Sequence, residues 1–211
     1  MTMASSLKAR ANLYLMPVIA FDALAEYGIL FQPDFAIAAQ IEAFKLAASS
    51  VLFIAIGIVL TGLLSANAKA RLVFWRWRHP LPGSRAFTEV ARTDPRVDLA
   101  RIRNAHGTLP RAPDQQNRLW YQIYQRHQRS PAVSDTHLRF LFCRDGAAAS
   151  VILFLFVGAI VAWARPAALL GVAALTLLAL QYLFFAIAGR FYGDRMICSV
   201  LALESSEAGK V

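Results

Sequence analysis

Residues 167–189 read AALLGVAALTLLALQYLFFAIAG, which is 23 positions without a charged side chain. Residues 46–68, LAASSVLFIAIGIVLTGLLSANA, are equally long and uncharged, and residues 146–164 are uncharged over 19 positions. A helix of about 20 apolar residues, rising about 1.5 Å per residue, crosses a hydrocarbon core of roughly 30 Å. These three runs therefore predict three transmembrane helices.

The composition of the whole chain agrees with this prediction. Hydrophobic residues make up 57% of the 211 positions and charged residues only 17%, whereas soluble domains carry about 25% charge. The charge is also concentrated: 15 of the 22 Lys and Arg residues lie between positions 69 and 144. An ordinary soluble domain is therefore excluded, and a basic segment separates two apolar regions.

Residues 13–31 are apolar but contain Pro17, Asp22 and Glu26. A carboxylate in the middle of a span costs about 2.5–3.5 kcal/mol unless it is paired or faces protein. A helix lying in the membrane interface is one alternative. A cleaved signal peptide is another, with the basic residues Lys8 and Arg10 before the apolar run and a small-residue site at Ala23-Leu24-Ala25. We expect a fourth span with its acids turned into a helix bundle.

The distribution of basic residues predicts the orientation. With four spans and residues 69–145 in the cytoplasm, 20 of the 22 Lys and Arg residues lie inside, and only Lys45 and Arg165 lie outside. Such a bias is typical of cytoplasmic loops of bacterial inner-membrane proteins. We therefore expect both termini in the cytoplasm and four regions: a membrane hairpin at 1–68, a basic helical cytoplasmic segment at 69–145, a second hairpin at 146–189 and a tail at 190–211.

The basic segment has helical patterns but no strand pattern, so the predicted fold class is all-α. The second span is expected to continue as a helix to Arg78, where Trp75, Arg76, Trp77 and Arg78 form an aromatic and basic membrane-interface belt. Further helices are expected over residues 95–106 with Asp94 as N-cap, over residues 114–129, and from about residue 134 onward. The two cysteines, Cys143 and Cys198, are interpreted as reduced thiols.

Two acidic side chains are predicted inside the membrane. Asp22 and Glu26 are spaced i, i+4 and so share one helix face. Intramembrane carboxylates often mark proton or cation paths or contacts between helices. Gln181 and Tyr182 are the candidate partners by residue type. The alternative is that both acids are solvated on an interfacial helix.

Small residues form two stripes on the predicted spans. Gly57, Thr61 and Ser65 recur at i, i+4 and i+8, and Gly158 and Ala162 at i, i+4. Small side chains allow helix backbones to approach closely. The stripes indicate helix packing within a bundle or between copies in a homo-oligomer.

The segment around residues 118–129 mixes cations with aromatic residues. We interpret five of its residues as a surface for docking a cytoplasmic partner: Arg118, Trp120, Tyr124, Arg126 and Arg129. The same composition suits a nucleic-acid binder, a helix facing anionic lipid headgroups, or a helix that packs its aromatic residues into a core.

No common catalytic or metal-binding motif is present in the sequence. There is no glycine-rich phosphate loop or G-x-S-x-G, and the four histidines have no metal-site spacing. We therefore expect no metal and no cofactor. Arg101 and His106 fit an R-x4-H pattern over six residues, which resembles the catalytic motif of HEPN ribonucleases. The resemblance implies that Arg and His from two protomers converge on an RNA backbone.

These observations favour a non-enzymatic bacterial inner-membrane protein that oligomerises and docks a cytoplasmic protein. A sensor, effector or pore subunit of a defence-type operon is the role that suits such a protein. A proton- or cation-coupled transport component using Asp22 and Glu26 is the first alternative. A membrane-tethered ribonuclease centred on Arg101 and His106 is the second.

Overall fold

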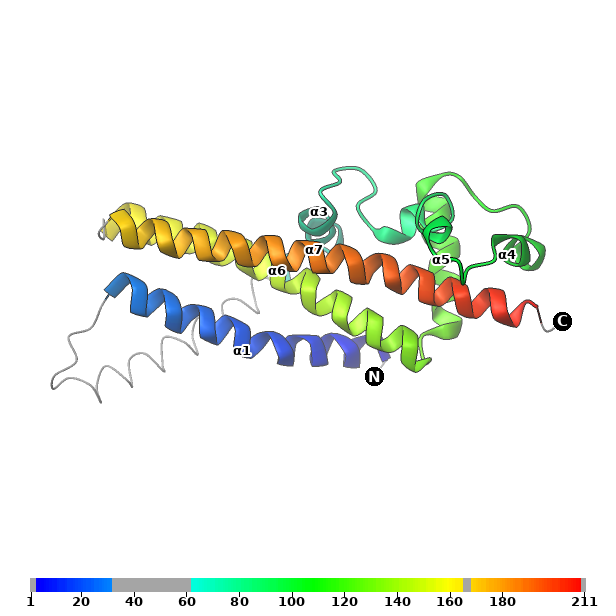
Figure 1. Ribbon diagram of the computed structural model, residues 1–211, viewed down its shortest axis with the longest axis horizontal. Helices are drawn as coiled ribbons and strands as arrows, with labels where there is room; N and C mark the ends of the chain where they lie inside the picture. The colour runs from blue at the N-terminus through cyan, green and yellow to red at the C-terminus, as the bar shows by residue number, and fades with distance from the viewer. Residues whose placement is uncertain (1–2, 32–61, 165–167, 210–211) are drawn as a thin grey trace.

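Two long antiparallel helices form the axis of the molecule (Figure 1). The computed structural model describes residues 3–31, 62–164 and 168–209, and every regular element in these ranges is helical. The all-α class is confirmed. The elements are α1 (Met3–Phe31), α3 (Ala66–Phe74), the 3-10 helices η1 (Pro82–Arg85) and η2 (Val90–Thr93), α4 (Leu99–His106), α5 (Pro113–His127), α6 (Pro131–Ala164) and α7 (Ala168–Glu207).

Helices α6 and α7 are the two described helices that are long and apolar enough to cross a membrane. At about 1.5 Å per residue, the 34 residues of α6 and the 40 residues of α7 are about 51 and 60 Å long. Both exceed the roughly 30 Å of a hydrocarbon core. The predicted apolar runs 146–164 and 167–189 account for a little more than half of each helix, and residues 131–145 and 190–207 extend beyond them.

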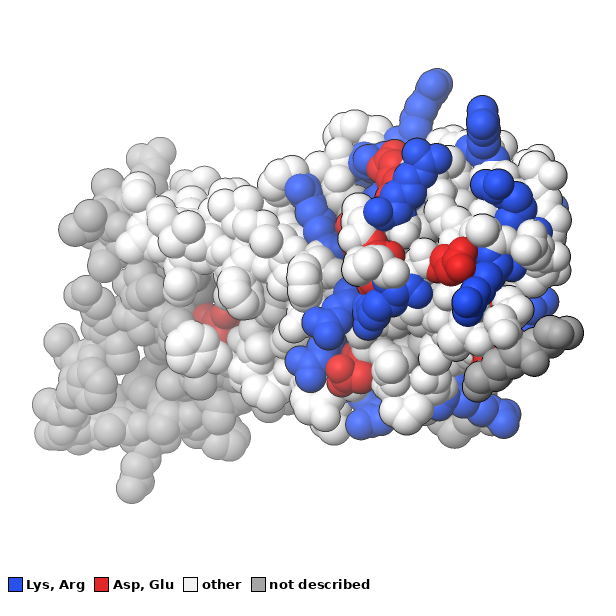
Figure 2. Space-filling model, turned by 45° about the vertical axis from the view of Figure 1, so that its right-hand side comes forward, with Lys and Arg blue, Asp and Glu red and all other residues white. Residues whose placement is uncertain are grey.

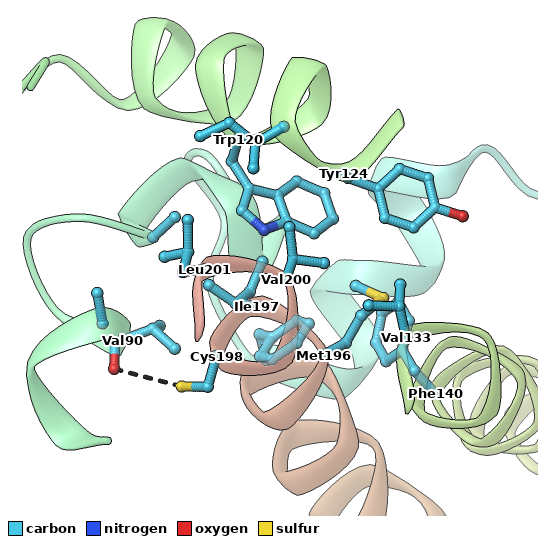
Figure 3. Close-up of a cluster of buried hydrophobic side chains, with 14 of the residues drawn as sticks. Val90, Trp120, Tyr124, Val133, Phe140, Met196, Ile197, Cys198, Val200 and Leu201 are labelled. Carbon is cyan, nitrogen blue, oxygen red and sulfur yellow. Dashed lines mark hydrogen bonds between the residues drawn. The ribbon is translucent and has the colours of Figure 1, made fainter. Parts of the chain in front are cut away.

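These extensions organise the rest of the chain. The end of α7 is surrounded by α4, α5, η1 and η2 (Figure 1). Its apolar side chains meet Trp120 and Tyr124 of α5 and Val133 and Phe140 of α6 in the largest buried cluster (Figure 3). The α7 residues in this cluster are Met196, Ile197, Cys198, Val200 and Leu201. We call this assembly the head.

Helix α1 packs along α6 in the same direction. Leu7 and Ala11 pack with Leu141, and farther along the helix Leu15 and Ile19 pack with Ala149. The beginning of α1 therefore lies beside the α6 extension, on the side of the bundle that carries the head.

The second span does not continue as a helix to Arg78. The hydroxyl of Ser65 accepts a hydrogen bond from the Ala68 amide and so caps a new helix, α3. Helix α3 ends at Phe74 because Trp75 adopts a left-handed conformation with φ of 53°. Two α7 side chains bind the last carbonyl groups of α3: the Tyr182 hydroxyl donates to the Leu72 carbonyl, and Arg190 donates to the Val73 carbonyl.

Four expected helix boundaries also differ from the structure. Asp94, the expected N-cap, accepts hydrogen bonds from the amide and guanidinium of Arg96. Asp98 instead accepts hydrogen bonds from the amides of Ala100 and Arg101, so α4 begins at Leu99. Helices α5 and α6 each begin at a proline, Pro113 and Pro131, one and three residues before the expected starts. Helix α7 passes through the expected boundary at Arg190 and continues to Glu207, so residues 190–207 belong to the head rather than to a separate tail.

Part of the predicted organisation lies outside the described residues. The span 46–68 is described only from Gly62 onward, and Gly57 and Thr61 fall before that point. Glu26 belongs to α1, but its side chain is outside the described part of the structure.

Candidate functional site

The predicted intramembrane acid Asp22 is buried between α1, α6 and α7. Gln181 donates from its Nε2 atom to Asp22 Oδ2 at 2.7 Å and to the Ser150 hydroxyl at 3.2 Å. Ser150 in turn donates to the Gly146 carbonyl at 2.9 Å. Gln181 was one of the two partners that the sequence suggested, and this contact links three helices through one side chain.

A buried ion pair lies one to two turns from this network. Lys69 Nζ of α3 is 3.0 Å from Asp145 Oδ1 of α6, and both side chains are almost completely inaccessible to solvent. Arg144 binds the same carboxylate oxygen at 2.9 Å, while Oδ2 of Asp145 has no hydrogen-bond partner among the described residues. The sequence showed Lys69 and Asp145 only as charges flanking two apolar runs. Their pairing depends on α3 and α6 lying side by side.

The aromatic and basic belt at residues 75–78 lies in an irregular segment after α3. Trp75 donates to the Tyr182 hydroxyl at 2.8 Å, and the Arg190 guanidinium lies 3.5 Å from the centroid of the Trp75 ring. Trp77 is 82% exposed. Arg76 forms an ion pair with Glu89 at 2.9 Å, and Arg78 is exposed.

The five residues predicted to dock a partner fall into two groups. Trp120 and Tyr124 are buried in the core of the head, where their rings stack with centroids 5.4 Å apart. The Tyr124 hydroxyl is 2.7 Å from His137 Nδ1, and burial raises the pKa of Tyr124 to about 12. Arg118, Arg126 and Arg129 are exposed. Of the five predicted residues, only the three arginines therefore lie on the surface.

Two histidines and two glutamates meet where α4 and α5 contact the end of α7. His106 and His127 place Nε2 at 2.7 and 2.6 Å from the two carboxylate oxygens of Glu204. Arg126 donates to the same carboxylate at 3.0 Å. Burial acts to raise the pKa of Glu204, but the hydrogen bonds from His127 and His106 outweigh it, so this pKa lies below the usual glutamate value.

Part of this cluster, together with Glu207, has the geometry of a metal site. His127, Glu204 and Glu207 each place a ligand atom within 4.8 Å of the other two. The Arg126 guanidinium on the central carboxylate opposes a divalent cation, because it occupies one of the oxygens and adds a positive charge. The arrangement therefore favours an ion cluster that ties α4 and α5 to α7. Sequence reasoning missed it because 77 to 98 positions separate its partners.

The side chains of the R-x4-H pattern have different partners. His106 binds Glu204, as described above, whereas Arg101 is paired with Asp98 at 3.2 Å on the surface of α4. Within this single chain the two residues do not converge on a common site.

The described residues of the predicted small-residue stripes lie in different environments. Ser65 is the cap of α3, Gly158 is half-buried on α6, and Ala162 is exposed. At Gly189 and Gly193, by contrast, α7 closely approaches α3. A Cβ atom added to Gly189 would lie 2.9 Å from Val73, and one added to Gly193 would lie 2.7 Å from Phe74.

Charged side chains gather over the head, whereas the other half of the molecule shows mostly uncharged atoms where it is described (Figure 2). The fold and this division define an all-helical protein with two helices long and apolar enough to span a membrane. No protein-family model matches the chain, and comparisons with curated proteins and with solved structures also find no match. The function must therefore be argued from the residues.

Proposed function

We propose that this chain is a multi-pass protein of the bacterial inner membrane whose cytoplasmic head docks an acidic protein partner, without catalysing a reaction. The observation that carries the proposal is the division of α6 and α7 into an apolar half and a half built into a basic head. Each helix is long enough to do both.

The outward faces of the apolar halves support a lipid environment. Large apolar side chains are exposed along both helices, among them Leu155, Trp163, Leu180, Phe184 and Ile187. Soluble monomers rarely expose contiguous apolar surface on this scale. In a bilayer the same side chains are in contact with acyl chains, and Trp163 and Trp77 suit the two headgroup regions.

The four-span topology with an inside head is also part of the proposal. The beginning of α1 packs beside Leu141, on the side of the head, which supports a cytoplasmic N-terminus if α1 spans. The head itself includes the C-terminal half of α7. Its arginines then lie where the anionic inner leaflet and acidic cytoplasmic ligands attract them.

The proposed docking surface consists of the exposed arginines on α5 and Arg129 just after its end. Arg118 and Arg129 form no ion pair within the described part of the chain, whereas Arg126 shares Glu204 with two histidines. Unpaired guanidinium groups are suited to bidentate binding of carboxylates on a partner. Their place on a helix held by buried Trp120 and Tyr124 keeps the surface rigid.

A matched pair of variants tests the docking surface. Arg118→Gln with Arg129→Gln is expected to insert and assemble normally but to lose the protein that co-purifies stoichiometrically with the wild type. Arg101→Gln with Arg195→Gln removes the same charge from other exposed positions and is expected to retain it. Retention by both variants, or loss from both, would refute docking through α5.

The buried network around Asp22 favours a second candidate function, a proton- or cation-coupled transport component. Asp22, Gln181 and Ser150 form connected hydrogen bonds, and the Lys69–Asp145 pair lies between one and two turns earlier on α6. Polar groups buried in a membrane bundle are costly and are often functional. Proteoliposomes containing the wild type would then dissipate an imposed pH gradient faster than those containing Asp22→Asn, and equal rates would remove this candidate.

A further inference from the structure

A cavity of about 450 Å³ opens on the head between η2, α4 and residues 108–111. Its lining includes three arginines, Arg92, Arg103 and Arg111, and no acidic residue. It shares no residue with the docking surface on α5. Cavities of roughly 300–1,000 Å³ are typical of small-molecule sites.

Local structure directs each arginine to this cavity. In η2, Val90 and Ala91 are buried and leave Arg92 on the outside. In α4, Leu99 and Arg103 are one turn apart and both line the cavity, while Ile102 is buried. Gly107 has φ of 77°, which favours glycine, and it turns the chain so that residues 108–111 return beside α4.

A buried glutamine holds the two walls together. Gln116 is only 2% exposed. Its Oε1 atom accepts from the amides of Phe87 and Thr88 at 3.1 and 3.2 Å on one wall, and its Nε2 atom donates to the Arg111 carbonyl at 2.8 Å on the other. The cavity is therefore preorganised by an interior side chain rather than left between mobile loops.

The charge in the cavity is uncompensated. Among the described residues, Arg92, Arg103 and Arg111 form no ion pair, whereas the neighbouring Arg96 and Arg101 are each paired with an aspartate. Three guanidinium groups around one cavity repel one another unless an anion lies between them. Guanidinium groups bind phosphate oxygens through paired hydrogen bonds.

The rest of the lining consists of two threonines and four apolar residues. Leu99, Leu109 and Pro110 provide surface against which the flat organic part of a ligand can pack. We propose that this cavity binds a nucleotide-like organic phosphate, with its phosphates on Arg92, Arg103 and Arg111 and its ring on the apolar wall. The site would make the head a small-molecule receptor, which goes beyond docking of a protein.

Binding of fluorescently labelled ATP to the detergent-purified full chain tests this site. At about 150 mM salt, where long-range attraction is screened, the wild type is expected to bind saturably. Arg103→Gln with Arg111→Gln is expected to bind at least about tenfold more weakly, because charge-assisted hydrogen bonds are lost. Arg118→Gln with Arg129→Gln is the matched control and is expected to bind as the wild type does. All four arginines are exposed, so equal thermal midpoints verify folding.

Three results would overturn the proposal. The first is the absence of saturable binding up to about 1 mM labelled ATP. A dissociation constant of about 1 mM corresponds to a binding free energy of only about 4 kcal/mol. The second is equal weakening of ATP binding in both double variants, which would show that binding depends on the net charge of the protein rather than on this cavity. The third is competition by pyrophosphate as strong as that by unlabelled ATP, which would leave the apolar wall without a role. Because the docking variant is the control, failure of this site and failure of the docking surface are distinguishable.

Discussion

Replacing Gly193 with alanine should destabilise the head, although the same change in most helices is stabilising. Gly193 lies in α7 where α3 and α6 cross it. The added Cβ atom would lie 2.7 Å from Phe74 and 3.1 Å from Phe140. Neither ring can easily move, because both are buried and the Arg85 guanidinium lies 4.7 Å from the centroid of the Phe74 ring.

The expected magnitude is the difference between two effects. Overpacking a well-filled core costs about 1–3 kcal/mol, and replacing a glycine inside a helix by alanine recovers about 0.8–1.0 kcal/mol. Gly193→Ala should therefore lose about 1 kcal/mol, or about 2–4 °C in thermal midpoint for a chain of this size. Gly158→Ala is the control: its Cβ atom would meet only Leu175, at 3.9 Å, so only the gain in helix propensity remains.

Thermal unfolding of the detergent-purified protein, followed by tryptophan fluorescence, measures both variants. Adding Phe74→Leu to Gly193→Ala should relieve the overlap and recover part of the loss, so the two substitutions should show a non-additive coupling. The close packing of α3 on α7 is refuted if Gly193→Ala melts at or above the wild-type temperature, or if the two substitutions add independently.

Three further predictions concern the buried charges. Lys69→Met or Asp145→Asn alone should lower stability by about 3–5 kcal/mol, and Lys69→Met with Asp145→Leu should recover part of it, because Arg144 still loses its carboxylate partner; a double variant as unstable as the singles would contradict the ion pair. Because the pKa of Glu204 is lowered in the folded protein, its contribution to stability is present above the ordinary glutamate value of 4.5 and is lost as the pH falls through the lower folded-state value. Glu204→Gln should therefore flatten the dependence of the thermal midpoint on pH in this acidic range, and an unchanged pH profile would remove Glu204 from the account. A chelator should leave the wild-type thermal midpoint unchanged if His127 and Glu204 form an ion cluster, and a fall on chelation would instead indicate a bound metal.

The long helices α6 and α7 were predictable because their signal is local. An uncharged run of 19 or 23 residues can be read without knowing any neighbour. The length of α6 was also predicted to within three residues, since a helix was expected from about residue 134 into this run. The extension of α7 was not predicted, because residues 190–207 carry charges and become interior to the head only through contacts with α4, α5 and the two 3-10 helices.

The details of the head depend on contacts between distant residues. As residue types, Asp94 and Asp98 are equally good N-caps. Asp98 caps α4 because the carboxylate of Asp94 is bound to Arg96. Trp120 and Tyr124 were assigned to a surface, although their spacing also allowed the buried face that they occupy. Gly189 and Gly193 have the same i, i+4 spacing as the predicted stripes. They differ from those stripes because α3 packs against them, which the sequence does not show.

A partner for Asp22 could be suggested from the sequence, whereas the partners of Glu204 could not. Gln181 could be suggested as a partner of Asp22 because few polar residues occur in the predicted spans. Glu204 lies in a charged segment with many possible partners, and its two histidines come from separate helices. The cavity formed by Arg92, Arg103 and Arg111 likewise needs the turn at Gly107 and the bridge from Gln116 before its charges converge.

Labelling of single introduced cysteines in cells tests the central claim that α6 crosses the membrane with the head inside. Cys143 and Cys198 are buried, so background labelling should be low. Trp163→Cys introduces a thiol at an 87% exposed position near the far end of α6, and Asn104→Cys introduces one on the exposed surface of α4. A membrane-impermeant maleimide applied to spheroplasts should label the cysteine at position 163, and should label that at position 104 only after permeabilisation. Labelling of position 104 in intact spheroplasts, or recovery of the chain in the soluble fraction, would contradict the account.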